Sequence, residues 1–446
     1  MDGEVVLTTV STIRPAASCE EEQAARAVLL NEIDHAHRRV RYFKRVLIYK
    51  ADDSIHRRFS DVFDKLKSSL SQVLVYFHPF AGRVRVRDDC LLELICNDEG
   101  VQIVEASTEV DLNSIEDFQP SSFFSKLAQT PGCDPVWPWK AEYPLLFVQV
   151  TAFRSGGFSV GVTFSHQIAD GTTIWHFLRS WAEIARGQNI SEHPQFMYKS
   201  LIKGSQTPSR KEPLPLYPIV KSQEDTVFVL SSDHLQCKLF HVAKEMIHKL
   251  KNLTAQSVNA RPFTTYEVIC AHIWQRVTIA RDIADEKPCK LVMAVNLRGK
   301  FAGLPQHYCG NGALYTAATA TAAQLKQGRL ASAAALIHQT IVRYTEEKVE
   351  ALLELIAEYM GNKEMEVSVD WDSDADMLVR SSPRLRMYET DFGWGRPTAV
   401  AFDTYLNHNG SLLLDAGREE GSLDVTLALS PQAMQRLNED IFFLPQ

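Results

Sequence analysis

The spacing of apolar residues predicts both helices and strands in the first half of the chain. Residues 59–76 repeat apolar side chains at three- and four-residue intervals, which is typical of an amphipathic helix. Residues 147–164 instead read as two strands joined at Ser155-Gly156-Gly157, a glycine-bearing hairpin signal. Residues 174–185 return to helical spacing. Because strand and helix patterns alternate along the chain, we expect the α/β class.

A proline-rich stretch divides the chain into two halves of similar size. Its prolines are Pro194, Pro208, Pro213, Pro215 and Pro218. Proline at this density disfavours both helices and central strands. A length of 446 residues also exceeds what one hydrophobic core usually serves. We therefore predict an N-terminal α/β domain at residues 1–186, a crossover linker at 187–224 and a C-terminal α/β domain at 225–446.

Composition and charge narrow the classes of partner and cofactor. The net charge of −8 argues against binding to nucleic acid or to an anionic membrane surface. The sequence has no run of 18 apolar residues and no basic, then apolar, N-terminal segment, so we expect a cytoplasmic protein with no membrane span. Eight cysteines occur without a CxxC pair, which predicts reduced thiols and no metal site.

One histidine follows a predicted buried strand. The alternate apolar residues of that strand are Phe158, Val160, Val162 and Phe164. His166 has the same parity, so its imidazole is expected to point inward just where Gly171 opens the next helix. The alternative is a core histidine with a satisfied hydrogen bond, followed by Asp170 as an ordinary helix N-cap. The spacing His-x-x-x-Asp alone does not decide between these readings.

Two motifs and several flanking segments carry a family resemblance. Residues 165–171, Ser-His-Gln-Ile-Ala-Asp-Gly, resemble the HxxxDG motif of the plant BAHD acyltransferases, and residues 391–395 match that family's DFGWG motif at every position. Four further segments resemble family passages in the same order along the chain. They are Leu66–Ser71 leading to Phe77–Arg83, Pro144–Thr151, Ala271–Trp274, and Asn296–Arg298 with Tyr308–Asn311.

This resemblance implies a fold and an activity. The fold is two similar chloramphenicol-acetyltransferase-like domains, each a mixed sheet with flanking helices, with a solvent channel between them. The activity is transfer of an acyl group from acyl-CoA to a hydroxyl, or an amine, of a small plant metabolite. Acyl-CoA is then a co-substrate, no cofactor is permanently bound, and the protein is a monomer. A neutral histidine suits the required base at cytosolic pH.

The resemblance also implies roles for individual residues. His166 would be the catalytic general base. Asp170 would point away from the substrate and pair with Arg298, and with Gly171 would shape the loop that presents His166. The second motif is interpreted as structural rather than catalytic, because its glycines allow tight turns and its tryptophan supplies buried area. Its residues are Asp391, Phe392, Gly393, Trp394 and Gly395.

The chain departs from the family pattern at three places. Arg380, Ser381 and Ser382 stand where many members have Thr-Ser-Trp, so they are candidates for an altered acyl-pocket wall. Residues 381–389 resemble an acetyltransferase-like and cutin-associated subgroup instead. Tyr42 falls near a family histidine of the acceptor pocket, and Cys309 replaces a phenylalanine.

Two other functions remain alternatives to acyl transfer. One is a repurposed enzyme that uses the same channel for lyase-type chemistry, and the other is a catalytically silent small-molecule-binding protein. Retention of His166, Asp170 and Gly171 argues against the silent protein. Cys309 is a possible rival nucleophile, although a free cysteine is more often a small buried hydrophobe.

Overall fold

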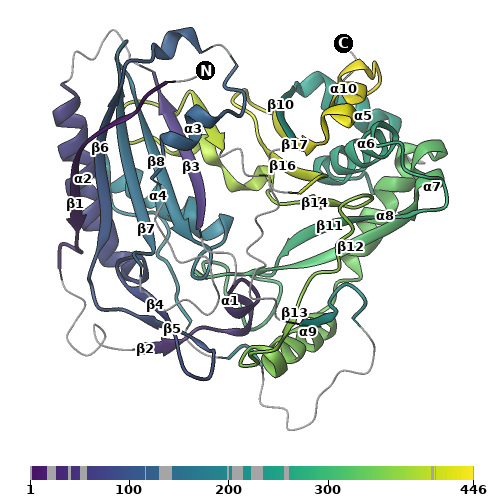
Figure 1. The fold of residues 1–446 in the computed structure, drawn as a ribbon, viewed down its shortest axis with the longest axis horizontal. Helices are drawn as coiled ribbons and strands as arrows, with labels where there is room; N and C mark the ends of the chain where they lie inside the picture. Colours follow the sequence, from purple (N-terminus) through teal and green to yellow (C-terminus); the bar gives the residue numbers. More distant parts are fainter. Residues whose placement is uncertain are drawn as a thin grey trace.

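In the computed structural model the chain forms two mixed sheets that lie beside each other, each with its own helices (Figure 1). This arrangement confirms the predicted α/β class and the two similar domains. The structure describes residues 3–17, 27–38, 42–50, 58–115, 117–129, 143–197, 200–202, 214–221, 235–255, 261–402, 406 and 408–444. Two of the eight cysteines, Cys19 and Cys133, therefore lie outside the described residues.

The N-terminal sheet has six strands in the order β1-β6-β7-β8-β3-β15. Their bounds are β1 Val6–Ile13, β6 Val101–Thr108, β7 Leu146–Phe153, β8 Phe158–Ser165, β3 Tyr42–Tyr49 and β15 Ala399–Phe402. Strands β7 and β8 are the predicted hairpin, paired antiparallel with Leu146 opposite Phe164. Strand β8 is buried along its whole length because both faces of the sheet are covered.

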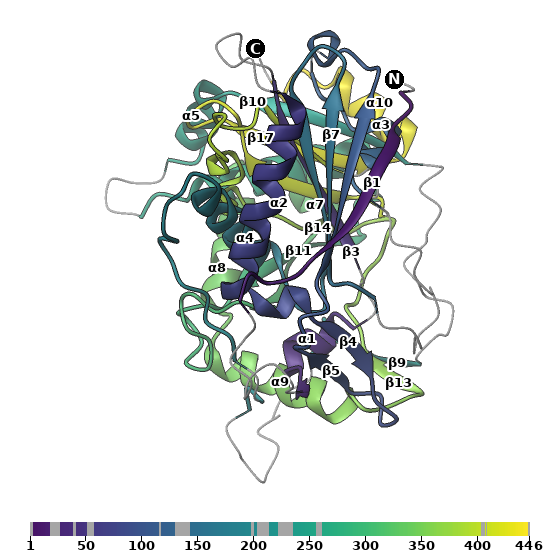
Figure 2. The same ribbon diagram turned by 90° about the vertical axis from the view of Figure 1, so that its left-hand side faces the viewer.

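Two helices pack together on one face of this sheet (Figure 2). Helix α2, Phe59–Tyr76, has the predicted bounds, and helix α4 spans Gly171–Ala185. Helix α4 begins three residues before the predicted range because the side chain of Asp170 caps it, accepting a hydrogen bond from the backbone of Thr173 at 3.0 Å. The short helix α3, Ser122–Lys126, packs on the opposite face.

The C-terminal sheet also has six strands, in the order β10-β17-β16-β14-β11-β12. Their bounds are β10 Gln236–Val242, β17 Leu423–Leu429, β16 Ser411–Ala416, β14 Met377–Val379, β11 Pro288–Asn296 and β12 Ala313–Thr321. Its helices are α5 Lys244–Leu253, α6 Thr265–Ala280, α7 Ala322–Gln327, α8 Leu330–Val342 and α10 Pro431–Glu439. All five contribute side chains to a core on one face of the sheet.

The other face of the C-terminal sheet is directed toward the N-terminal domain. Leu413 and Ala428 on this face belong to the hydrophobic core of the N-terminal domain, so the two domains are packed against each other there. Farther along the same face, Ala294 and Asn296 of the central strand β11 remain exposed. A central strand with exposed side chains requires open space above it, so this face borders solvent between the domains.

Smaller elements gather at one end of the molecule in both views (Figures 1 and 2). They are the strands β2 Ala27–Leu29, β4 Arg83–Val86, β5 Leu92–Ile95, β9 Ile219–Lys221 and β13 Met365–Val367, and the helices α1 Glu32–Ala36 and α9 Glu346–Tyr359. The 3₁₀ helices of the described residues are His78–Ala81, Leu112–Ser114, Pro383–Leu385 and Met387–Glu389.

One strand departs from the predicted division of the chain into domains. Strand β15 lies within residues 225–446, yet it pairs with β3 and forms the edge of the N-terminal sheet. The C-terminal part of the chain therefore returns to the first domain immediately after the DFGWG segment. Strand β9 lies within the predicted linker and pairs with β13.

Candidate active site

His166 lies directly after the end of β8, five residues before α4 begins. The side chains of matching parity in β8, beginning with Phe158 and ending with Phe164, all lie in the core beneath α2 and α4. His166 continues that face and is partly buried. The ring of Phe43 contacts it edge-on, with centroids 4.8 Å apart. The ring of His37 stacks on it at 4.4 Å and an interplanar angle of 16°.

Asn311 fixes the orientation of the His166 imidazole. The amide nitrogen Nδ2 of Asn311 donates to the carbonyl oxygen of His166 at 2.7 Å and to Oδ1 of Asp34 at 2.9 Å. Its Oδ1 must therefore be the atom that meets Nδ1 of His166 at 3.0 Å, and it accepts the Nδ1 proton. This hydrogen bond selects the tautomer in which Nε2 is unprotonated.

The surroundings keep the imidazole neutral. Burial lowers the pKa of His166 below its ordinary value, although the charge of Asp170 and the hydrogen bond to Asn311 act in the opposite direction. Burial and the neighbouring His166 lower the pKa of His37 to about 3, so the stacked ring carries no charge at neutral pH. A neutral imidazole with an unprotonated Nε2 is the form that can accept a proton.

Asp34 is the buried acceptor behind Asn311. Its carboxylate accepts from the backbone and side-chain nitrogens of Asn311 and from the backbone of Asn31. Burial raises the pKa of Asp34 to about 7 despite these hydrogen bonds. The backbone and side chain of Asn31 complete a capping box with Asp34 at the start of α1, which holds this carboxyl group in place.

Asp170 and Arg298 form the ion pair that the family resemblance implies. Two guanidinium nitrogens of Arg298 donate to the two carboxylate oxygens of Asp170, at 2.8 and 2.9 Å. Arg298 also donates to the carbonyl oxygens of Tyr308 and Gly310. Burial would raise the pKa of Asp170, but the Arg298 charge and hydrogen bonds from the backbone of Gly312 and Thr173 hold it below the ordinary value. This pair joins the first turn of α4 to the segment that carries Asn311.

Gly171 is tightly enclosed at the start of α4. A side-chain carbon placed on Gly171 would lie 3.2 Å from Cδ1 of Leu385, so a larger residue would have to displace that leucine. The loop after His166 is therefore held by the ion pair of Asp170 with Arg298 and by close packing of Leu385 against Gly171.

The DFGWG segment lies at the far end of β8 from His166. Phe392 is fully buried against Trp181, and Trp394 meets Phe158, the first residue of β8, with centroids 5.2 Å apart. Eight residues of strand span about 25 Å, so this motif is remote from the histidine. Oδ1 of Asp391 accepts from the backbone of Gly393 and Gly395, both of which have positive φ. The contacts are those of a structural turn.

Residues 380–382 follow β14, and their three side chains have different surroundings. Ser381 Oγ accepts from the backbone of Leu414 at 2.7 Å, and Ser382 Oγ caps the 3₁₀ helix Pro383–Leu385. Arg380 is level with Ala294 on the face of the C-terminal sheet that borders solvent, because Val379 pairs with Met293. The side chain of Arg380 is therefore directed along this interdomain face.

Tyr42, the candidate acceptor-pocket residue, does not face His166, and its place in an acceptor pocket stays a prediction. Tyr42 pairs with Ser165, so its side chain shares the face of Ser165 and not that of His166. Its hydroxyl donates to the carbonyl oxygen of Pro144 at 2.8 Å, and its ring packs edge-on against Phe147. The rings of Phe43, one position later, and of His37 contact the imidazole.

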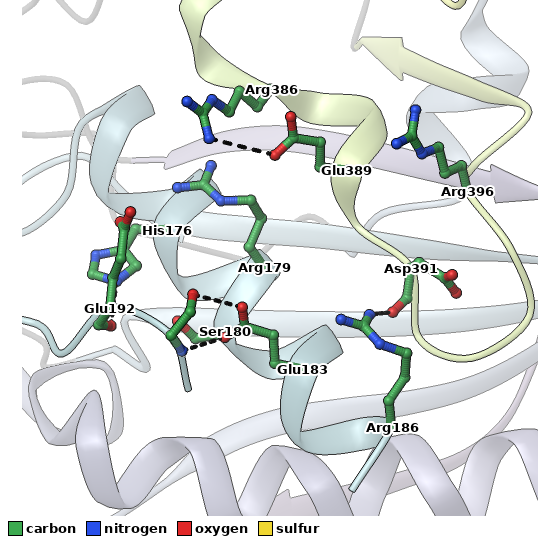
Figure 3. Close-up of a pocket in the computed structure, with 11 residues that line it drawn as sticks. His176, Arg179, Ser180, Glu183, Arg186, Glu192, Arg386, Glu389, Asp391 and Arg396 are labelled. Carbon is green, nitrogen blue, oxygen red and sulfur yellow. Dashed lines mark hydrogen bonds and ion pairs between the residues drawn. The ribbon is translucent and has the colours of Figure 1, made fainter. Parts of the chain in front are cut away.

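A separate pocket of about 440 Å³ lies along α4 and the segment before DFGWG (Figure 3). Its lining mixes arginines with carboxylates and includes neither His166 nor Asn311. Arg386 pairs with Glu389, Arg186 donates to the backbone of Asp391, and Ser191 donates to Glu183. Because its lining lacks both His166 and Asn311, this pocket does not form part of the histidine site.

Metal-binding clusters and membrane-spanning helices are both absent from the described part of the chain. No group of three or more His, Cys, Asp or Glu side chains is placed there to hold a metal ion. None of the helices described above has the length and apolar character needed to cross a bilayer.

Comparisons with known proteins cover nearly the whole chain. Residues 4–444 match the Transferase family. Anthranilate N-benzoyltransferase protein 1 of Dianthus caryophyllus is 30% identical over 96% of this chain and 97% of its own length. Shikimate O-hydroxycinnamoyltransferase of Nicotiana tabacum is 27% identical over 84% of this chain and 87% of its own. The resemblance of residues 381–389 to an acetyltransferase-like subgroup stays a prediction, because these relatives transfer other acyl groups.

Solved structures show the same fold. Vinorine synthase superposes with a TM-score of 0.75 at 22% identity, covering 99% of this chain and 98% of that one. TRI101 of F. graminearum, in complex with coenzyme A and T-2 mycotoxin, gives a TM-score of 0.77 at 15% identity over 93% and 98%. Together with the sequence matches, these comparisons show that the chain belongs to the BAHD acyltransferases of the Transferase family, enzymes that use acyl-CoA as co-substrate.

Proposed function

We propose that this enzyme transfers an acyl group directly from acyl-CoA to a hydroxyl or amine of a small metabolite, with His166 as general base. The hydrogen bond between Nδ1 of His166 and Oδ1 of Asn311 carries the proposal, because it leaves Nε2 as the proton acceptor. The relatives are named for an amine acceptor, anthranilate, and for a hydroxyl acceptor, shikimate, so both acceptor classes are included.

The chemistry needs one base and no covalent intermediate with the protein. Nε2 of His166 takes the proton of the acceptor while its oxygen or nitrogen forms a bond to the thioester carbonyl carbon. The resulting tetrahedral oxyanion collapses, the carbon–sulfur bond breaks, and coenzyme A leaves as the thiolate. The imidazolium then returns its proton to that thiolate, which restores the neutral base.

Other residues are proposed to act through His166 or through the scaffold. The pair of Asp170 and Arg298 holds the loop that presents the imidazole, since both partners are buried and fully hydrogen-bonded. The DFGWG segment stabilises the start of β8, which ends at His166. Removal of either support is expected to displace the base rather than to remove a reacting group.

The setting of the enzyme is proposed from its charge and its family. With a net charge of −8, it is expected to act as a cytoplasmic monomer that binds neither nucleic acid nor membranes. Its binding partners are then acyl-CoA and the small-molecule acceptor.

The test is release of free thiol when the enzyme is mixed with an acyl-CoA and an alcohol or amine. His166→Ala should lower kcat by about 10²–10⁴-fold, the usual worth of a positioned base, without loss of folding. His248→Ala is the matched control, because His248 is exposed on α5 in the other domain. A folded His166→Ala protein with wild-type turnover would refute the base assignment.

The same assay separates the alternatives. Consumption of an acceptor without thiol release would indicate lyase-type chemistry. Binding of both substrates without any reaction would indicate a silent binding protein.

A further inference from the structure

Arg380 is a cation on the interdomain face of the C-terminal sheet. Its backbone nitrogen donates to the carbonyl oxygen of Leu412, but its Nε is buried and has no hydrogen-bond partner. Among the described residues, no carboxylate forms an ion pair with its guanidinium. The neighbouring groups that its charge affects are neutral, a tyrosine phenol and an imidazole, those of Tyr315 and His408.

The energetics of such a group favour an external anion. A guanidinium stays protonated in proteins, so burial does not relieve its charge. Partial burial of an unpaired charge is unfavourable unless a counter-charge is supplied. Arg298, by comparison, is buried with two carboxylate oxygens and several carbonyl oxygens around it. Arg380 has the same fork of donors, and the described part of the chain supplies its guanidinium with no carboxylate.

Strand register places Arg380 within reach of the His166 site. Arg380 is level with Ala294, and Ala294 pairs with Tyr315 on β12, so all three lie in one row on the face that borders solvent. Two residues earlier on β12, the backbone of Ala313 lies beside His37, the ring stacked on His166. Strand spacings put Ala313 about 12 Å from the backbone of Arg380, a distance that a small substrate and an arginine side chain can span.

We propose that Arg380 binds a carboxylate of the substrate and so selects acidic substrates. This inference rests on the proposed function, since it assigns a specificity to the same site. The planar guanidinium matches a carboxylate with two parallel hydrogen bonds, which a lysine does not reproduce. The carboxylate belongs either to the acyl group or to the acceptor, because Arg380 lies between the domains where both substrates must meet.

The experiment compares acidic and neutral substrates that differ only in the carboxylate. The acyl arm uses succinyl-CoA against butyryl-CoA with one neutral alcohol. The acceptor arm uses 4-hydroxybenzoate against its methyl ester with benzoyl-CoA. The variants are Arg380→Gln, which removes the charge, and Arg380→Lys, which keeps it without the fork. Arg384→Gln is the matched control, because it makes the same substitution at an exposed position four residues away.

In one of the two arms, the kcat/KM of the wild type should be higher for the acidic substrate than for its neutral counterpart. Arg380→Gln should reduce this acidic-to-neutral ratio of kcat/KM about 10- to 100-fold, the scale of a charge-assisted pair. Arg380→Lys should be intermediate and Arg384→Gln unchanged. An unchanged ratio in Arg380→Gln would overturn the inference. So would an equal loss for acidic and neutral acyl-CoAs, which would mean that Arg380 binds phosphates of coenzyme A.

Equilibrium binding separates this inference from the proposed function. Calorimetric titration with the same four ligands reports selectivity for the carboxylate without turnover. Selective binding that is lost in Arg380→Gln, with no thiol released by the wild type, would support the inference and refute acyl transfer. Turnover without any selectivity for the carboxylate would support acyl transfer and refute the inference about Arg380. Because no carboxylate of the described residues would lose its ion pair, the Arg380 variants are expected to fold.

Discussion

Replacement of Asn311 by leucine tests the origin of the reactive tautomer of His166. Leucine is close in size to asparagine but offers neither an acceptor for Nδ1 nor a donor for the carbonyl oxygen of His166. The two hydrogen bonds that connect these residues, at 3.0 and 2.7 Å, are then lost together. We expect lower kcat/KM with His166 itself unchanged.

The size of the effect follows from those contacts. A neutral hydrogen bond is worth about 0.5–1.5 kcal/mol net, so loss of the tautomer preference alone costs roughly 2- to 13-fold. Loss of the fixed orientation of the imidazole lowers kcat/KM further, with an upper limit of about 10²–10⁴-fold, the contribution of the base itself. The expected decrease for Asn311→Leu is therefore about 10- to 100-fold, larger than tautomer loss and smaller than loss of the imidazole.

Asn31→Leu is the matched control. Asn31 is an equally buried asparagine of the same network, and its side chain donates to Tyr308 and caps α1 without contacting His166. Both variants should be less stable, because each leaves buried polar groups unpaired. Steady-state kinetics, normalised to the folded fraction from thermal unfolding, should show the large decrease in kcat/KM for Asn311→Leu only. Activity of Asn311→Leu within twofold of wild type would contradict the role of this residue.

Three further predictions concern the same site. Asp170→Asn should cost about 3–5 kcal/mol of stability by leaving Arg298 unpaired. Denaturant unfolding of Asp170→Asn, Arg298→Gln and the double variant should show strong coupling between the two positions. Additive losses of stability would contradict the pair. Because burial lowers the pKa of His166, the acid limb of kcat/KM should have its midpoint below 6.5, the ordinary value for an imidazole. A midpoint above pH 7 would contradict this assignment. Cys309→Ala should remain active, and intact-mass measurement after exposure to acyl-CoA alone should show no acyl-enzyme.

Local periodicity was sufficient to predict the elements that hold the histidine. The bounds of α2, the hairpin of β7 and β8, and the inward parity of His166 depend on side chains near in sequence, which share a face whenever the strand or helix forms. The pairing of Asp170 with Arg298 came from the family resemblance, since nothing local connects residues 128 positions apart.

The partners of the imidazole could not be predicted in the same way. Asn311 is 145 residues from His166 and Asp34 is 277 residues from Asn311, and only the packing of two domains brings them together. Asn311 lay within a segment recognised from the family, but nothing marked its side chain as the acceptor for Nδ1. Tyr42 faces away from His166, because one position of strand register moves a side chain to the opposite face of a sheet. His37 had no signal in the sequence.

A second histidine near the site shows why His166, and not a cysteine, is expected to carry the reaction. Nε2 of His176 lies 2.8 Å from the carbonyl oxygen of Glu192, so Nε2 holds the proton and Nδ1 faces Sγ of Cys309 at 3.4 Å. A thiol beside an unprotonated imidazole has the geometry of a nucleophile and its base.

The electrostatics of this second pair differ from those of a reactive thiolate. Burial raises the pKa of Cys309 to about 12, and burial lowers the pKa of His176, so both groups are neutral near pH 7. Arg298 favours the thiolate, but burial outweighs its charge. His166 is also neutral, and the neutral imidazole is the form that accepts a proton. A cysteine instead attacks as the charged thiolate. Burial therefore favours the direct route at His166 and opposes the covalent route at Cys309.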